Sequence, residues 1–119
     1  MGRTLVLGAS MRKERFSYLA MKSLHEHQFE FAAIGAKEGE AFGVEIKKGL
    51  PELSNIHTVT LYLNPERQKE YYHYILSLKP NRIIFNPGTE NGELFKLARE
   101  AGIEVVIGCT LVMLHNKSF

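Results

Sequence analysis

Hydrophobic residues in this chain occur in short continuous runs that alternate with segments of helical periodicity. The aliphatic run 5–7 predicts a central parallel strand that is buried on both faces. After it, a helix is predicted over 16–27, and a second strand over 29–34 that ends at Gly35. The buried stripe of that helix is predicted to contain Phe16, Leu19, Ala20 and Leu24.

The second half of the chain repeats this alternation. Strands are predicted over 59–63, 82–85 and 103–107, with helices over 64–79 and 94–101 and an apolar helical turn over 109–114. Asn64 and Pro65 form a strong helix start, because an asparagine caps the free amides and a proline needs no hydrogen-bond acceptor there. Residues 36–54 are punctuated by glycine and proline, and only 44–46 fits a brief strand. Irregular stretches of this length are usually functional or flexible.

Five strands separated mostly by helices predict an α/β fold. We expect a three-layer, doubly wound, parallel five-stranded sheet of Rossmann-like type with strand order 3-2-1-4-5, and one domain over residues 1–119. In that order the ligand crevice opens between the first and fourth strands, at their carboxyl ends. The loops 8–15 and 86–92 are then expected to border it.

The first strand ends in small residues, Gly8, Ala9 and Ser10, just before a helix. A strand–turn–helix junction of this kind leaves backbone N–H groups free at the positive end of the helix, where phosphate groups bind. Three cations follow in the same loop, namely Arg12, Lys13 and Arg15. They favour a pyrophosphate, although charged loop residues are equally often only solvated.

The turn does not match the dinucleotide fingerprint G-x-G-x-x-G, since only Gly8 of the three glycines is present. The second strand is followed by Lys37, where NAD binding requires a carboxylate. A cation at this position suits a phosphate on the ribose, as in NADP or coenzyme A. Polar residues in the loop 86–91 offer further ligand contacts, although Asn-Pro-Gly is also ordinary turn chemistry.

Composition limits the partners. The 119 residues include 15 basic and 13 acidic side chains, a net charge of +2, which gives no general attraction to nucleic acid or to anionic membranes. No apolar run approaches the roughly 20 residues that span a bilayer, and no signal peptide is recognisable. With one cysteine and therefore no intrachain disulfide, we expect a cytoplasmic protein.

No catalytic or metal-binding constellation is predicted. The five histidines are not spaced as common metal ligands, and no serine or cysteine has an identifiable base partner. Cys109 follows the fifth strand and has two interpretations, a small core residue or a thiol placed to react with a ligand thiol.

Several blocks, taken in order, resemble the small stand-alone CoA-binding proteins, which are similar to the CoA-binding Rossmann-type domain of the succinyl-CoA synthetase α subunit. These blocks are Gly8-Ala9-Ser10 with Arg15, Lys37-Glu38-Gly39-Glu40, Thr60-Leu61-Tyr62-Leu63-Asn64-Pro65, Phe85-Asn86-Pro87-Gly88-Thr89-Glu90-Asn91 and Cys109-Thr110-Leu111-Val112. The resemblance extends over nearly the whole chain.

The resemblance implies a set of coenzyme A contacts. It implies that Gly8, Ala9, Ser10 and Arg15 hold the phosphates, that Lys37 lies by the adenosine, and that the pantetheine path is lined by Asn64, Pro65, Asn86, Pro87, Gly88, Thr89, Glu90 and Asn91. Members of the family often have Asn-Pro before the lysine, whereas this chain has Gly35-Ala36.

The leading hypothesis is therefore non-catalytic binding of coenzyme A or an acyl-CoA, as a sensor or as an accessory to another protein. One alternative is a small enzyme that depends on NADP or another nucleotide. Another is a domain that has lost its ligand and acts through protein contacts.

Overall fold

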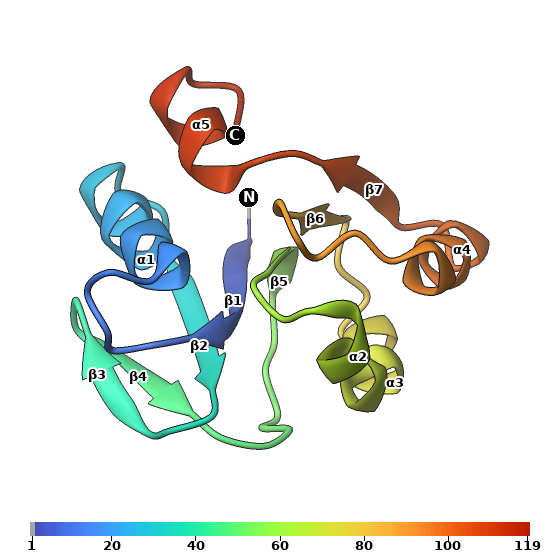
Figure 1. Ribbon diagram of the computed structural model, residues 1–119, viewed down its shortest axis with the longest axis horizontal. Coiled ribbons are helices and arrows are strands. Elements are labelled where there is room, and N and C mark those ends of the chain that lie inside the picture. The colour runs from blue at the N-terminus through green and yellow to red at the C-terminus, as the bar shows by residue number, and fades with distance from the viewer. Residues whose placement is uncertain (1) are drawn as a thin grey trace.

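The computed structural model describes residues 2–119 as one twisted sheet with helices on both faces (Figure 1). The strands are β1 (Arg3–Ala9), β2 (Phe31–Gly35), β3 (Gly39–Ala41), β4 (Val44–Lys47), β5 (Ile56–Leu61), β6 (Arg82–Phe85) and β7 (Glu104–Ile107). The helices are α1 (Phe16–Glu26), α2 (Pro65–Gln68), α3 (Tyr72–Ser77), α4 (Gly92–Glu100) and α5 (Thr110–His115), with a 3₁₀ turn, η1 (Lys69–Tyr71), between α2 and α3.

The predicted α/β, Rossmann-like class is confirmed, but the predicted five-stranded sheet with order 3-2-1-4-5 is wrong. The sheet has seven strands in the order β3-β4-β2-β1-β5-β6-β7, and the β3–β4 pair is antiparallel. The segment 36–54 explains the difference, because it folds into the β3–β4 hairpin and β4 pairs with β2. With that side of β2 occupied, β5 pairs with the free side of β1.

This order moves the expected crevice. The chain leaves β1 toward β2 on one side and returns to β5 on the other, so the strand order reverses between β1 and β5 rather than between the first and fourth predicted strands. Ligands of open α/β sheets bind at such a reversal, beyond the carboxyl ends of the strands. The loop after β1 and the loop after β5 border it, and the loop 86–92 after β6 lies one strand farther away.

Two hydrophobic layers hold the sheet. One face packs against α1 and α5 through Met21, Leu24 and Leu114, and the other packs against α3 and α4 through residues such as Ile75 and Leu94. Figure 1 shows these helices on opposite sides of the strands. Within residues 2–119, no helix combines the length and the hydrophobicity that crossing a membrane requires.

Two helical predictions need correction. The buried residues of α1 are Ser17, Ala20, Met21 and Leu24, whereas Phe16 is 70% exposed. The stripe therefore begins at Ser17, a small residue that the hydrophobic pattern could not select. The helix predicted over 64–79 is divided into α2, η1 and α3.

Candidate functional site

Gly8 brings two loops into contact at the reversal of strand order. Its φ of +100° disfavours other residues, and a Cβ there would lie 2.9 Å from the carbonyl carbon of Tyr62. The Tyr62 amide also donates a hydrogen bond to the carbonyl of Leu7, at 2.8 Å. The pairing with β2 is interrupted by a bulge between Leu7 and Ala9. The small residue predicted to permit a phosphate turn is thus required by the fold at this point.

The next two residues of the turn offer main-chain groups and one hydroxyl. Ala9 is buried in the core with α1, so its side chain is not available to a ligand. The Oγ of Ser10 accepts a hydrogen bond from the amide of Arg12, at 3.1 Å. That bond shapes the turn and leaves the hydroxyl hydrogen of Ser10 free to donate.

The amino end of α1 has no side-chain cap. Arg15 occupies the N-cap position without a capping hydrogen bond, and the first turn contains no acidic residue. A cation at this end opposes the helix dipole, so an anion bound there would be stabilised both by the free amides and by Arg15. Asn64 caps α2 and Asn91 caps α4, so α1 differs from the two helices that follow β5 and β6.

Only part of the positive charge in this loop is compensated. Arg12 forms an ion pair with Glu14, with 2.9 Å between Nε and Oε1. A backbone hydrogen bond, assisted by Arg12, lowers the pKa of the Glu14 carboxyl. Lys13 and Arg15 form no ion pair within residues 2–119. The loop therefore presents two uncompensated cations beside the open end of α1.

A buried glutamine that the sequence analysis missed joins the loops after β5 and β6. The Gln68 Nε2 donates to the carbonyl oxygens of Leu63 and Thr89, at 2.8 Å each, and its Oε1 accepts from Asn91 Nδ2 at 2.9 Å. Gln68 lies at helical spacing from Tyr71 and Ile75, so extending the predicted stripe by one turn would have identified it as buried.

The predicted ligand loop after β6 is held by its own polar side chains. Asn86 is buried, and its Nδ2 donates to Thr60 Oγ1 at 2.7 Å and to the carbonyl of Leu61 at 2.8 Å. Its Oδ1 accepts from the amide of Thr110 at 2.8 Å. The buried Thr89 hydroxyl donates to the Asn86 carbonyl at 2.7 Å. These side chains order the loop, and the surface it presents comes from Pro87, Gly88 and Glu90, which are exposed.

Asn64 and Pro65 perform the structural roles that the sequence indicated. The Oδ1 of Asn64 accepts from the amide of Arg67 at 2.9 Å, and Pro65 is the first residue of α2. Lys37 is exposed in the bend between β2 and β3. The preceding Gly35 lies so close to β1 that a Cβ would overlap the carbonyl oxygen of Ala9, which accounts for a glycine in this chain.

A polar cluster lies at the end of β5 beside α5. The hydroxyls of Thr60 and Thr110 are hydrogen-bonded at 2.8 Å, and both neighbour the phenol of Tyr62. Burial raises the pKa of Tyr62 to about 12. Cys109 is half-buried at the N-cap of α5, also near this phenol. The thiol, the phenol and the threonines thus share one corner of the crevice.

The raised pKa of Tyr62 predicts a loss of stability in alkali. The folded protein keeps this proton between pH 10 and about 12, whereas the unfolded chain releases it from pH 10 upward, so the free energy of unfolding falls as the pH rises through this window. Urea denaturation below and within the window measures the loss, and Tyr62→Phe is expected to reduce it. An equal loss in the variant would contradict the assignment to Tyr62.

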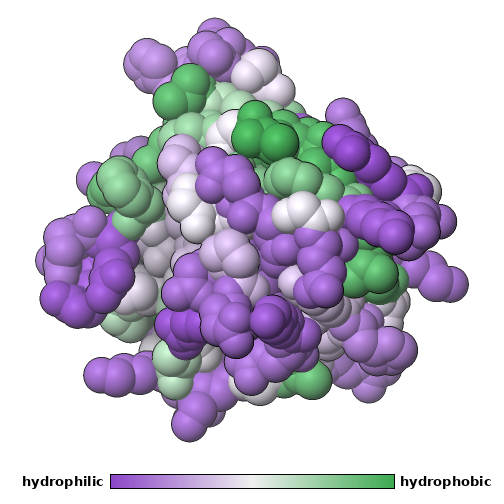
Figure 2. Space-filling model, turned by 45° about the vertical axis from the view of Figure 1, so that its right-hand side comes forward, coloured by the Kyte–Doolittle hydropathy of each residue, from purple (hydrophilic) through white to green (hydrophobic). Residues whose placement is uncertain are grey.

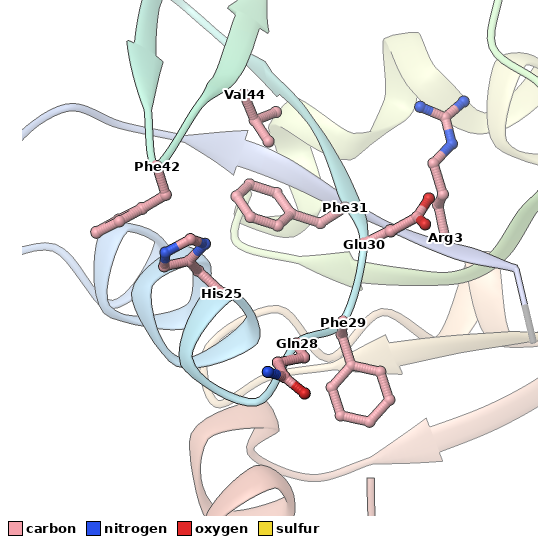
Figure 3. A pocket seen from close by; sticks show the side chains of 8 residues that line it. All are labelled: Arg3, His25, Gln28, Phe29, Glu30, Phe31, Phe42 and Val44. Atoms are coloured by element: carbon pink, nitrogen blue, oxygen red, sulfur yellow. The ribbon is translucent and has the colours of Figure 1, made fainter.

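One pocket of the structure lies away from these residues. It is open to solvent, has a volume of about 480 Å³, and lies at the amino ends of β1 and β2, where His25, Phe31, Phe42 and neighbouring residues line it (Figure 3). None of the sequence-predicted site residues lines it. Within residues 2–119 there is no cluster of three or more metal-ligating side chains.

Known proteins are similar to this chain over its full length. A crystal structure of an uncharacterized protein is 52% identical with a TM-score of 0.96, covering 100% of this chain and 98% of that one. A hypothetical protein from Pyrococcus horikoshii is 26% identical with a TM-score of 0.86, covering 98% and 82%. A Thermus thermophilus structure is 23% identical with a TM-score of 0.85, covering 99% and 91%, and shows the fold alone. No curated protein matches the chain.

The family comparison agrees with the sequence resemblance. It also agrees with the position of the β1–α1 turn, a candidate phosphate site, where the strand order reverses. The sequence profile of a family described as a CoA binding domain matches residues 2–115. The chain therefore belongs to the CoA binding domain family.

Proposed function

We propose that this protein binds coenzyme A or an acyl-CoA without catalysing a reaction, with the pyrophosphate at the β1–α1 turn. The observation that carries the proposal is the uncapped amino end of α1, which lies beside two unpaired cations at the reversal of strand order. Free amides and uncompensated positive charge together favour a multiply charged phosphate. Membership of the CoA binding domain family supports coenzyme A as the ligand that carries this phosphate group.

The ligand is proposed to extend in two directions from that turn. The adenosine would lie toward Lys37 after β2, and the pantetheine would follow the loops after β5 and β6, past Asn64 and Gly88. Gln68 joins those two loops, which supports a preformed wall on the pantetheine side.

The contacts of two polar side chains at the site favour binding without chemistry. Within residues 2–119, the hydroxyl of Ser10 is hydrogen-bonded only to a backbone amide, and Glu90 is bonded to the amide of Gly88. Neither contact activates a nucleophile. We propose in addition that the protein acts as a sensor or as an accessory to another protein, in the cytoplasm and as a single domain.

The proposal predicts tight binding of coenzyme A that depends on Lys37. Lys37→Ala is expected to weaken coenzyme A binding about tenfold in calorimetric titration, since one charge-assisted contact to the ribose phosphate is lost. Lys22→Ala, which removes an exposed charge on α1, is the matched control and should leave the affinity unchanged.

Titration with NADPH separates the competing functions. Binding of NADPH with turnover would replace this proposal by the nucleotide-dependent enzyme. Failure of coenzyme A, dephospho-CoA and NADPH alike to bind would favour a domain that acts through protein contacts.

A further inference from the structure

We propose that β7 forms an interface between two copies of this chain, in which the two edge strands pair antiparallel about a two-fold axis and join the two sheets. This inference goes beyond the proposed function and does not depend on it. β3 and β7 are the two edges of the sheet. An edge strand offers unpaired backbone groups to other chains unless shortness, charge or a bulge protects it.

The β3 edge is protected in this way, whereas the β7 edge is not. β3 has three residues, and its central residue, Glu40, is exposed and charged. β7 has the sequence Glu-Val-Val-Ile, with neither a lysine nor a proline. Val105 and Val106 are half-buried, and Ile107 is 60% exposed. An edge of β-branched residues is well suited to pairing with another strand.

The backbone of β7 has a symmetric set of free groups. The amides of Glu104 and Gly108 donate to the carbonyls of Asn81 and Phe85, on the β6 side, at 3.0 and 3.2 Å. Because backbone groups alternate in direction along a strand, those of Val105 and Ile107 point away from β6. Within residues 2–119, β6 is the single strand that pairs with β7. Two amides and two carbonyls are therefore left without a strand partner.

One antiparallel register uses all four of these groups. When Val106 lies opposite the partner's Val106, Val105 of each copy lies opposite the partner's Ile107. Val105 and the partner's Ile107 then exchange two N–H···O bonds, and the two-fold axis repeats them for a total of about four. Val105 belongs to the core on the α4 side, so these pairs meet on that face and the Val106 pair meets on the other. Such cross-strand pairs of β-branched side chains stabilise a sheet.

The charge pattern favours a second copy as the occupant of this edge. Glu104 is the charged residue of β7, and in this register it lies opposite the partner's Gly108. The two Glu104 residues are about 14 Å apart along the paired strands. Each of them also lies opposite Arg82 of its own β6. Like charges therefore do not meet in the paired strands.

Hydrophobic surface continues beside the strand. Figure 2 brings the β7 side of the molecule forward and shows hydrophobic residues gathered in the upper part of this face, at the height of β7 and α5. A Cβ on Gly108 would lie 3.8 Å from Sδ of Met113, so α5 packs beside the end of β7. Val112 on the same helix is 56% exposed. A two-fold axis places the same surface of both copies in one interface.

The first test is sedimentation velocity of the full chain at increasing concentration. The unmodified protein is expected to shift from 13.5 kDa toward twice that mass. Ile107→Pro removes an outward amide but no bond to β6, and it is expected to weaken the dimer at least about tenfold. Ile107→Val keeps the amide, and Leu50→Lys replaces an exposed hydrophobic residue after β4, so both are expected to remain dimeric. Circular dichroism of dilute samples verifies that each variant is folded.

A disulfide tests the register itself. In a Cys109→Ser background, Val106→Cys places two thiols in a pair that is not hydrogen-bonded, with about 4.5 Å between the Cα atoms, which a disulfide can span. Oxidation is expected to cross-link this variant. Glu104→Cys in the same background places the thiols too far apart and is expected to stay uncross-linked.

Two results would overturn the interface. One is an unmodified chain that stays monomeric at every concentration, which would leave the β7 edge to a strand of a different protein. The other is a dimer that Ile107→Pro does not weaken or that Val106→Cys does not cross-link, which would place the contact on another surface or in another register. Neither result bears on the proposed function, which the titration with coenzyme A tests separately.

Discussion

Gly8→Ala is expected to abolish measurable coenzyme A binding and to lower the free energy of unfolding by about 2–4 kcal/mol. The new methyl group would lie 2.9 Å from the carbonyl carbon and 3.0 Å from the carbonyl oxygen of Tyr62, in a backbone conformation with φ of +100°. Relief requires the loops after β1 and β5 to separate. That movement displaces the amides proposed to hold the pyrophosphate.

Gly43→Ala is the matched control for this experiment. Gly43 has a φ of +79°, but a Cβ there meets no atom within 4 Å, and it lies at the tip of the β3–β4 hairpin. Gly43→Ala should therefore lower the free energy of unfolding only by the backbone strain, about 1 kcal/mol, and leave coenzyme A binding unchanged. Urea denaturation and calorimetric titration measure both effects. Equal behaviour of the two variants would mean that the contact with Tyr62 has no influence on the site.

Asn86→Leu is expected to destabilise the protein by about 3–5 kcal/mol, although Asn86 was predicted as a ligand contact. The substitution keeps a side chain of similar size but removes three hydrogen bonds, to Thr60, Leu61 and the amide of Thr110. It leaves the Thr110 amide and the Leu61 carbonyl buried without this partner. Because the bonds join β5, β6 and α5, their loss should loosen the whole carboxyl edge.

Asn64→Ala provides the comparison for that variant. Asn64 is exposed and makes one capping bond, to the amide of Arg67, so its replacement should cost only about 1 kcal/mol. Both variants are compared by urea denaturation. If Asn86→Leu costs no more than Asn64→Ala, the buried network contributes less than its geometry implies.

Strands with continuous aliphatic runs were predicted well, because such a run indicates a strand buried on both faces whichever strands it pairs with. The predicted range of the fourth strand agrees with β6, and the brief strand at 44–46 is part of β4. The order of the strands could not be derived in the same way. It depends on which side of β2 the hairpin occupies, and that choice is made by long-range pairing between Ala33 and Ile46.

The candidate site could be predicted from the sequence where its residues also determine the local backbone structure. The glycine turn, the Asn64 cap and the loop cations follow from rules that act within a few residues. Gln68 was missed for a different reason. Its importance arises from a contact across the sheet edge with Thr89, which lies 21 residues farther along the chain.

The bonds made by Gln68 have a consequence for motion at this edge. Since one side chain joins the carbonyl groups of Leu63 and Thr89, the two segments it connects shift together or not at all. In the described chain, the side-chain hydrogen bonds of Ser10 and Arg12 stay within the segment after β1, and Met11 packs on Gly39. The loop after β1 is therefore expected to adjust to ligands of different shape, while the loops after β5 and β6 keep one fixed conformation.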